Sequence, residues 1–256
     1  VYTITPTNDG SYLVGGDFTS YSGVSINRIV KLTSTGDVDT LFNIGAGFDN
    51  YVYPMIKTSD NNYMIGGLFS SYSGVSANKL IKLTPTGTID TSFSIGTGFN
   101  NLVLSIVETS DNGYLVGGYF TSYSGISANK IIKLTSTGSI DTSFVIGTGF
   151  NQDVYTIIKT NDGGYLVGGN FTTYKGTTTN KLVKLTSNGS IDASFNVGTG
   201  FNNYVYTITP TNDGSYLVGG DFTTYNGVSI NRIVKLTANG SIDTSFNVGS
   251  GFNQVA

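Results

Sequence analysis

The charged side chains of this sequence recur at fixed places, and they are the first candidates for chemistry. Ten basic residues occupy two repeated positions: Arg28, Lys79, Lys130, Lys181, Arg232 and Lys31, Lys82, Lys133, Lys184, Lys235. Ten aspartates occupy two others: Asp9, Asp60, Asp111, Asp162, Asp213 and Asp39, Asp90, Asp141, Asp192, Asp243. Such carboxylates could act as an acid–base pair, hold a cation or form ion pairs. The chain has no His and no Cys, which removes the usual nucleophile–base pairs and the common zinc ligands.

The spacing of these charges reveals a repeat of 51 residues without insertion or deletion. Copies begin at Val1, Val52, Val103, Val154 and Val205, and Ala256 alone is left over. A period near 50 residues is typical of solenoids, propellers and arrays. We therefore expect one domain over 1–256, made of the repeats 1–51, 52–102, 103–153, 154–204 and 205–255.

A charge that is the same in five copies suits a scaffold better than a site. We expect Asp39 and its counterparts to cap a turn by accepting nearby backbone N–H groups. Lys31 and its counterparts should lie along apolar surface and pair with a turn carboxylate. Calcium in the turns is the alternative. However, Asp37 is the only second carboxylate near these turns and no Asp-x-Asp-x-Asp-Gly loop occurs, so we expect no metal and no cofactor.

The first repeat predicts the elements that position these residues. In order, they are a strand at 1–5, a type I′ hairpin turn at 8–10, a strand at 12–18, a loop at 19–27, a strand at 28–32, a turn at 33–39 and a short strand at 40–44. No segment shows a sustained helical period, so essentially no helix is expected. Four short antiparallel strands in a fixed repeat indicate propeller blades.

The apolar pattern supports an all-β, five-bladed propeller. Tyr12, Leu13 and Val14 are apolar in succession, so both faces of that strand require cover, which the neighbouring blades supply. The Gly15-Gly16 doublet, present in every copy, should let neighbouring sheets approach closely. Because the fifth copy resembles the first, blade five should meet blade one, giving a monomeric ring.

Three motifs resemble the delta-60 repeat family of bacterial β-propellers. They are Leu13-Val14-Gly15-Gly16-Asp17-Phe18, Asn27-Arg28-Ile29-Val30-Lys31-Leu32 and Gly240-Ser241-Ile242-Asp243-Thr244-Ser245-Phe246. The resemblance covers the whole chain, with Leu41 and the polar loop Thr177-Thr178-Thr179 as mild departures. It implies a propeller of large surface-associated or phage-associated proteins without an assigned activity.

Composition restricts the partners. A net charge of −3 provides no basic face for nucleic acid. No apolar run approaches the ~20 residues of a membrane helix, so membrane insertion is not expected. The Gly-Gly doublets lack the Gly-Lys-Ser/Thr of a phosphate loop.

The loop between the second and third strands offers the best ligand candidates. It carries one tyrosine in each copy: Tyr21, Tyr72, Tyr123, Tyr174 and Tyr225. Tyrosine beside Asn, Ser and Gly suits stacking and hydrogen bonding to sugars or to protein loops. The alternative is that these rings wedge between blades.

Positions at which the copies differ are the other candidates. One set ends the second strand: Asp17, Leu68, Tyr119, Asn170 and Asp221. Another leads into the first strand: Tyr51, Leu102, Asp153, Tyr204 and Val255. A third is Pro6, Lys57, Glu108, Lys159 and Pro210. We expect the first two sets on the loop face, near the mouth of the channel, with Asp17, Tyr119, Asn170, Asp221, Asp153 and Tyr204 as ligand-binding candidates; drift at surface positions explains the variation equally well.

The sequence thus predicts a non-catalytic binding module of a cell-surface, secreted or virion protein, with carbohydrate or protein as ligand. The alternatives are a purely structural repeat scaffold and a carboxylate-based hydrolase.

Overall fold

The chain is built of short strands. A computed structural model describes residues 1–254, and no helix occurs among them. In particular, the described residues contain no helix that is long and apolar enough to cross a membrane. The expectation of an all-β chain is confirmed.

Each repeat contributes five strands. The first strands are β1 (Thr3–Pro6), β6 (Val52–Lys57), β11 (Val103–Glu108), β16 (Val154–Lys159) and β21 (Val205–Pro210). The second strands are β2 (Tyr12–Gly15), β7 (Tyr63–Gly67), β12 (Tyr114–Gly118), β17 (Tyr165–Gly169) and β22 (Tyr216–Gly220). Two-residue strands form small hairpins: β3 and β4 (Ser20–Tyr21, Val24–Ser25), β8 and β9 (Ser71–Tyr72, Val75–Ser76), β13 and β14 (Ser122–Tyr123, Ile126–Ser127), β18 and β19 (Thr173–Tyr174, Thr177–Thr178), β23 and β24 (Thr224–Tyr225, Val228–Ser229). The last strands are β5 (Ile29–Leu32), β10 (Leu80–Leu83), β15 (Ile131–Leu134), β20 (Leu182–Leu185) and β25 (Ile233–Leu236).

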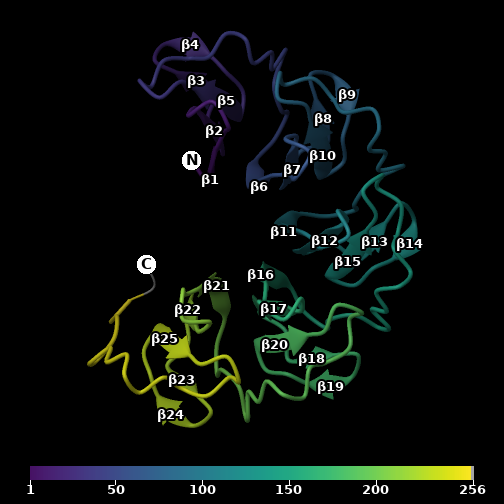
Figure 1. The fold of residues 1–256 in the computed structure, drawn as a ribbon. Helices are drawn as coiled ribbons and strands as arrows, with labels where there is room; N and C mark the ends of the chain where they lie inside the picture. The colour runs from purple at the N-terminus through teal and green to yellow at the C-terminus, as the bar shows by residue number, and fades with distance from the viewer. Residues whose placement is uncertain (255–256) are drawn as a thin grey trace. The chain divides into compact units, whose positions relative to one another are not determined.

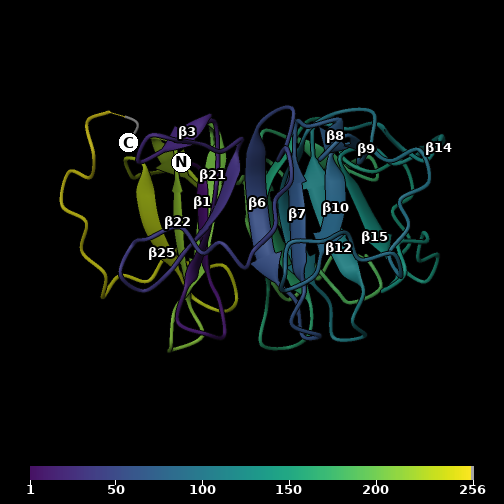
Figure 2. The ribbon, with the colours of Figure 1, turned by 90° about the horizontal axis from the view of Figure 1, so that it is seen from above.

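The first, second and last strands of each repeat form one antiparallel sheet, with the second strand in the middle. Figure 1 shows this order for β6, β7 and β10. Figure 2 shows the hairpin β8–β9 at one end of that sheet. We call this end of a repeat the hairpin end (16–28 and the link 45–51 of the first repeat). The opposite end, with the turns at 7–11 and 33–39, is the turn end.

The described chain divides into two compact units, and the boundary falls within the third repeat. Unit 1 comprises Val1–Val116, Phe120–Ser127 and Lys133–Ile140, and unit 2 is the rest of the described chain. That 1–256 forms a single ring-shaped domain stays a prediction.

The turn between the first and second strands differs from the type I′ turn that Asn8-Asp9-Gly10 predicts. Only Gly10 has a positive φ, at 77°. Thr7 donates its N–H to the carbonyl of Ser11 at 2.9 Å, and Asp9 accepts the Ser11 N–H. The side chain of Asp9 therefore stabilises a longer loop in which one residue, not two, requires the left-handed conformation.

The predicted fourth strand at 40–44 does not form. The fourth-strand position is a single bridge between Leu32 and Val38, repeated in the other copies. The segment after it turns at Asp39, and Asn43 donates its N–H to the carbonyl of Thr86 in the following repeat at 2.8 Å. Pairing with the next repeat thus takes these residues out of their own sheet.

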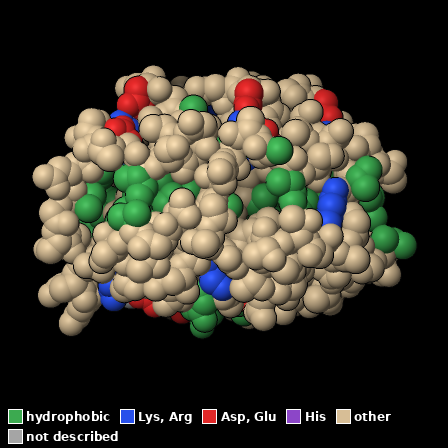
Figure 3. All heavy atoms as spheres, turned by 90° about the horizontal axis from the view of Figure 1, so that it is seen from below, with side chains coloured by type: hydrophobic (Ala, Val, Ile, Leu, Met, Phe, Trp, Pro, Cys, Tyr) green, Lys and Arg blue, Asp and Glu red, His purple; other side chains and the backbone are tan. Residues whose placement is uncertain are grey.

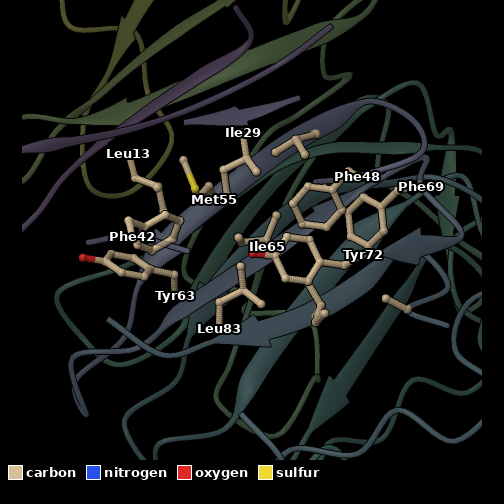
Figure 4. Close-up of a cluster of buried hydrophobic side chains, with 13 residues drawn as sticks. Leu13, Ile29, Phe42, Phe48, Met55, Tyr63, Ile65, Phe69, Tyr72 and Leu83 are labelled. Atoms are coloured by element: carbon tan, nitrogen blue, oxygen red, sulfur yellow. The ribbon is translucent and has the colours of Figure 1, made fainter. Parts of the chain in front are cut away.

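Apolar side chains of consecutive repeats interlock within each unit. In unit 1, Leu13 and Ile29 of the first repeat belong to one buried cluster with Met55, Tyr63 and Ile65 of the second (Figure 4). Packing between repeats supplies the cover that the run of apolar residues in the second strand requires.

Glycine permits this approach of the sheets. A Cβ built on Gly66 would lie 2.6 Å from Cγ1 of Val103 and 2.8 Å from Cγ of Pro54. Gly168 faces Val205 in unit 2 at 2.5 Å in the same way. The prediction that the Gly-Gly doublets allow close packing of sheets is confirmed at these positions.

The repeated charges form a clamp at the turn end. Lys31 Nζ lies 2.6 Å from Asp9 Oδ2 and 2.8 Å from Asp39 Oδ2, and its side chain is only 8% exposed. Asp39 also accepts the N–H of Leu41, so it caps its turn. Lys82, Lys184 and Lys235 are bound by two aspartates in the same manner. The expected pairing is confirmed, and each lysine joins two turns rather than one.

The clamp stabilises the charged forms of its aspartates and lysines. Hydrogen bonds from Lys184 and Thr160 lower the pKa of Asp162 to about 2. Burial opposes the charge on Asp111, but hydrogen bonds from Lys133 and Thr109 outweigh it and lower its pKa to about 2. Burial likewise opposes the charge on Lys184, whose bonds to Asp162 and Asp192 nevertheless raise its pKa.

Replacing one clamp lysine should destabilise the protein. Lys82→Met leaves Asp90, a carboxylate whose side chain is 13% exposed, without its cation. We expect a loss of about 3 kcal/mol in the free energy of unfolding, measured by urea denaturation. The exposed Lys159 provides the control, since Lys159→Met should change stability by less than about 0.5 kcal/mol. Equal losses in both variants would contradict the role of the clamp.

The clamp also predicts how stability depends on pH. The folded pKa of Asp111 and Asp162, about 2, lies below the ordinary value of about 3.9. The ion pairs therefore stabilise the fold fully above about pH 4, and this stabilisation is lost as the pH falls towards 2. Urea unfolding between pH 7 and 2 should show a decline confined to the acid range. The decline should be shallower in Asp162→Asn, and an unchanged slope would show that Asp162 does not contribute.

Candidate functional site

The loop tyrosines have a packing role, which corrects the expectation that they line a ligand face. Tyr72, Tyr123, Tyr174 and Tyr225 are at most 2% exposed, and Tyr21 is half-buried. Each hydroxyl donates to the carbonyl of a turn glycine fifteen residues later, as Tyr123 does to Gly138 at 2.6 Å. Burial raises the pKa of Tyr72, Tyr123, Tyr174 and Tyr225. All five rings tie the hairpin to the turn after the last strand, and the four buried ones present no surface to a ligand.

Other tyrosines gather at the hairpin end of the first strands. In unit 1, the rings of Tyr2 and Tyr53 are stacked, with centroids 4.8 Å apart and planes at 5°. Tyr51 meets both edge-on at 6.2 Å. Tyr2 is 52% exposed, and Tyr51 and Tyr53 are half-buried. The unit 1 tyrosine cluster (Tyr2, Tyr51, Tyr53) therefore offers aromatic surface to solvent.

Unit 2 carries a larger cluster of the same kind, formed by Tyr119, Tyr155, Tyr204 and Tyr206. The ring of Tyr155 lies at the centre, 6.0 Å from Tyr119, 6.1 Å from Tyr204 and 5.6 Å from Tyr206. Tyr206 is 42% exposed, and the other three are half-buried. We call these four residues the unit 2 tyrosine cluster.

Charged groups lie beside the unit 2 cluster. Lys130 Nζ lies 3.0 Å from Asp153 Oδ1 and donates to the carbonyl of Tyr119 at 2.9 Å. Asp221 accepts a hydrogen bond from Asn203 at 3.1 Å. The cluster thus combines aromatic rings with a cation, two carboxylates and an amide.

Burial and these neighbours keep Tyr155 and Tyr206 protonated. Burial raises the pKa of Tyr155, and the proximity of Tyr119 and Asp153 adds to the effect. Burial also raises the pKa of Tyr206, with Asp221 contributing. The hydroxyls of Tyr155 and Tyr206 are therefore neutral donors and acceptors at physiological pH.

The structure brings together four residues predicted as ligand-binding: Tyr119 and Tyr204 in the cluster, and Asp153 and Asp221 beside it. Asn170 adjoins them through its N–H, which donates to the carbonyl of Asp153 at 2.9 Å. Asp17 is exposed in unit 1 and pairs with Arg28 at 3.4 Å. Val255 lies outside the described residues.

Sequence reasoning missed Tyr2, Tyr53, Tyr155 and Tyr206. A signal was present, because alternate residues of a strand point to opposite faces. The first-strand valine is buried in each of β6, β11, β16 and β21, so the residue after it should face away from the packed side. In four of the five copies that residue is tyrosine.

Carboxylates of the described residues make hydrogen bonds and ion pairs with the turns and strands around them. Glu108, the only glutamate, accepts the N–H and the hydroxyl of Ser59 in the neighbouring turn. The described residues contain no cluster of three or more His, Cys, Asp or Glu that could hold a metal ion. Figure 3 shows one face of the molecule, on which charged side chains are sparse.

Five repeated antiparallel sheets, packed face to face within each unit, define an all-β protein of the β-propeller class. The chain belongs to the family described as a β-propeller domain of unknown function (DUF5122), which matches residues 7–42, 58–93, 109–144, 160–195 and 211–246. A repeat-propeller family, as the three motifs implied, is thereby confirmed, although the match does not bear on the name delta-60. No curated protein sequence matches the chain.

Solved structures share the fold at low identity. Virginiamycin B lyase from Staphylococcus aureus is 16% identical, with a TM-score of 0.56 over 94% of this chain and 68% of the lyase. The extracellular domain of a putative one-component system from B. thetaiotaomicron is 15% identical, with a TM-score of 0.54 over 91% of this chain and 26% of that one. PorZ, a surface component of the type-IX secretion system of Porphyromonas gingivalis, is 14% identical, with a TM-score of 0.53 over 96% of this chain and 34% of PorZ. This likeness shows the fold alone.

The family matches omit the first strands. Residues 43–57, 94–108, 145–159 and 196–210 lie between the matched segments. The clusters lie in or next to these segments except for Tyr119, and Tyr2 precedes the first match. The family match therefore covers the scaffold and does not cover most of the tyrosine clusters.

The packing role of the loop tyrosines can be tested by removing a single hydroxyl group. Tyr123→Phe removes the hydroxyl that donates to Gly138 and leaves that carbonyl without its donor. We expect a loss of about 1 kcal/mol in the free energy of unfolding, measured by urea denaturation. Tyr12→Phe, at a tyrosine that is 45% exposed, should cost less than about 0.5 kcal/mol. Equal stability of the two variants would show that the buried hydroxyl is dispensable.

Proposed function

We propose that the chain is a non-catalytic binding module that holds a carbohydrate against the unit 2 tyrosine cluster. One observation carries the proposal: four tyrosines from three different repeats converge, partly exposed, beside Lys130, Asp153 and Asp221. These side chains are partly exposed, and Tyr119 and Tyr204 lie at positions where the copies differ, which is more easily explained by a ligand than by the folding of the blade.

The chemistry of the cluster favours a sugar. A pyranose ring presents C–H groups on its faces and hydroxyls around its rim. Tyrosine rings stack on the former, while neutral phenol groups, carboxylates and an amide accept and donate hydrogen bonds to the latter. A protein loop uses similar contacts but usually requires a larger apolar surface at its centre. We therefore place carbohydrate before protein as the ligand.

A catalytic role is less well supported. Some structural neighbours are lyases, and a histidine-to-alanine variant of the S. aureus lyase is described as catalytically inactive. This chain has no His, and its glutamate is bonded to Ser59. The neighbours that are extracellular domains or surface components support a role at the cell surface or in a secreted protein.

Glycan-array binding tests the proposal. For a glycan that the wild-type protein binds, Tyr155→Ala and Tyr206→Ala should each weaken binding at least about 10-fold, because loss of one stacked ring costs about 1.4 kcal/mol or more. Tyr206→Phe keeps the ring and should retain most of the affinity, which separates stacking from hydrogen bonding. Binding would be measured by isothermal titration calorimetry after the array.

Tyr12→Ala is the matched control, since it removes an exposed tyrosine at the turn end of unit 1. It should leave glycan affinity unchanged. Equal weakening by Tyr12→Ala and Tyr206→Ala would show that the unit 2 cluster is not the site. If no glycan binds at all, the structural scaffold expected as the alternative becomes the better account.

A further inference from the structure

One basic residue recurs immediately before the last strand of each repeat. These residues are Arg28, Lys79, Lys130, Lys181 and Arg232, and all five adopt the left-handed backbone conformation, with φ between 67° and 70°. Residues other than glycine seldom adopt this conformation. Because the backbone is the same in each copy, differences between the five charged groups arise from the residues around them.

Three of these basic residues have a carboxylate partner, which comes from one of two variable positions. Arg232 pairs with the residue at the end of the second strand, its Nη2 lying 3.8 Å from Asp221 Oδ1. Arg28 pairs with the equivalent aspartate of the first repeat. Lys130 pairs with the link to the following repeat, where its Nζ lies 3.0 Å from Asp153 Oδ1.

In the fourth repeat both of these positions are neutral. Asn170 ends the second strand, and Tyr204 occupies the link. Lys181 Nζ donates to the carbonyl of Asn170 at 3.0 Å, just as Lys130 donates to that of Tyr119, so the two ammonium groups are placed alike. Within the described part of the chain, no carboxylate forms an ion pair with Lys181. An ammonium group has three N–H donors, so two of them remain for a ligand.

Lys181 is also removed from water. Its side chain is half-buried, and burial lowers its pKa. The clamp residue Lys184 experiences burial in the same direction, but its two aspartates outweigh the effect and raise its pKa. A partly buried cation without a counter-charge is unfavourable, and an anion that reaches it restores the balance.

Lys79 has no ion pair among the described residues either, but its surroundings differ. Its Nζ donates to the hydroxyl of Ser70 at 3.2 Å. The two variable positions of its repeat are Leu68 and Leu102, where the fourth repeat has an amide and a phenol. Leucine side chains form no hydrogen bonds to a sugar, so Lys79 is a matched comparison at the same backbone position.

Lys181 adjoins the unit 2 tyrosine cluster. The residue whose carbonyl it bonds, Asn170, donates its N–H to the carbonyl of Asp153 at 2.9 Å, two residues before Tyr155. The link position of its repeat is Tyr204, whose ring lies 6.1 Å from that of Tyr155. The fourth and fifth repeats, which flank Lys181, both belong to unit 2.

We infer that the ligand of the unit 2 tyrosine cluster is an acidic sugar, and that Lys181 binds its anionic group while the rings hold the sugar. The inference rests on the proposed function and narrows its ligand class. Lys130 and Arg232 are matched by Asp153 and Asp221, so Lys181 supplies the positive charge that remains among these five groups. The anionic group is a carboxylate or a sulfate, since an ammonium group binds either as a point charge.

A glycan array of matched pairs provides the test. It carries glucuronate, galacturonate, sialylated and sulfated oligosaccharides, each beside its methyl ester or its unsulfated parent. At least one acidic glycan should bind about 10-fold or more tightly than its neutral counterpart, because a charge-assisted hydrogen bond distinguishes them. The pair that shows the difference identifies the anionic group as carboxylate or sulfate.

Variants then locate the charge, with affinities measured by calorimetry on the best-bound acidic glycan and its neutral counterpart. Lys181→Met should weaken binding of the acidic glycan about 10-fold and leave the neutral one unchanged, whereas Lys181→Arg should retain most of the affinity. Asn170→Asp should weaken acidic binding as well, because it gives Lys181 the partner that Asp221 gives Arg232. The first and fifth repeats carry aspartate at this position, so the blade accommodates it. Lys79→Met is the control and should leave both affinities unchanged.

The inference and the proposed function fail in different ways. The inference is overturned if no acidic glycan binds, if acidic and neutral glycans bind equally, or if Lys79→Met weakens binding as much as Lys181→Met. A neutral glycan that Tyr155→Ala weakens and Lys181→Met does not would overturn the inference and leave the proposed function in place. An acidic glycan that Lys181→Met weakens and Tyr155→Ala does not would retain the anion site and contradict the tyrosine cluster as the sugar site.

Discussion

Contact between a glycine in one sheet and a valine in the next sets the distance between neighbouring blades within each unit. At Gly66 and Gly168 a methyl group would collide with the valine of the following repeat. The absence of that methyl group lets the apolar faces close over Leu13, Ile29 and their counterparts in repeats two to four, which are then fully buried. Aromatic pairs such as Phe42 with Tyr63 complete the same interface.

The two ends of a blade are held by different chemistry. At the turn end, a buried lysine joins two aspartates, and removing either charge leaves the other uncompensated in a poorly solvated place. At the hairpin end, a tyrosine hydroxyl donates to the carbonyl of a glycine in the turn after the last strand. In both places the polar atoms are engaged in hydrogen bonds or ion pairs that stabilise the blade. This separates the repeated residues, which build the blade, from the tyrosine clusters, whose rings remain partly exposed.

The residues of the unit 2 cluster lie at positions that take no part in the lysine–aspartate pairs or in the tyrosine–glycine hydrogen bonds. Tyr155 and Tyr206 follow the buried valine of their strands and face away from the packed side. Tyr119 and Tyr204 come from positions that differ among the copies, at the end of a second strand and in a link. The family matches omit the first strands, so membership of the family explains the scaffold but not this surface. Because one fold supports many functions, a binding role depends on the chemistry of this surface and not on the propeller fold.

By itself, the sequence determined the all-β class, the five units, the inter-sheet role of Gly15-Gly16 and the pairing of Lys31 with a turn carboxylate, because these follow from local pattern and from a strict period. It also singled out Tyr119, Tyr204, Asp153 and Asp221. Only the tertiary structure decided that Tyr123 is buried while Tyr206 is exposed, since both are tyrosines in or beside strands and their environments depend on the following turn and the adjacent repeat. It likewise decided that 40–44 pairs with the next repeat, because a hydrogen bond between repeats leaves no trace in local sequence.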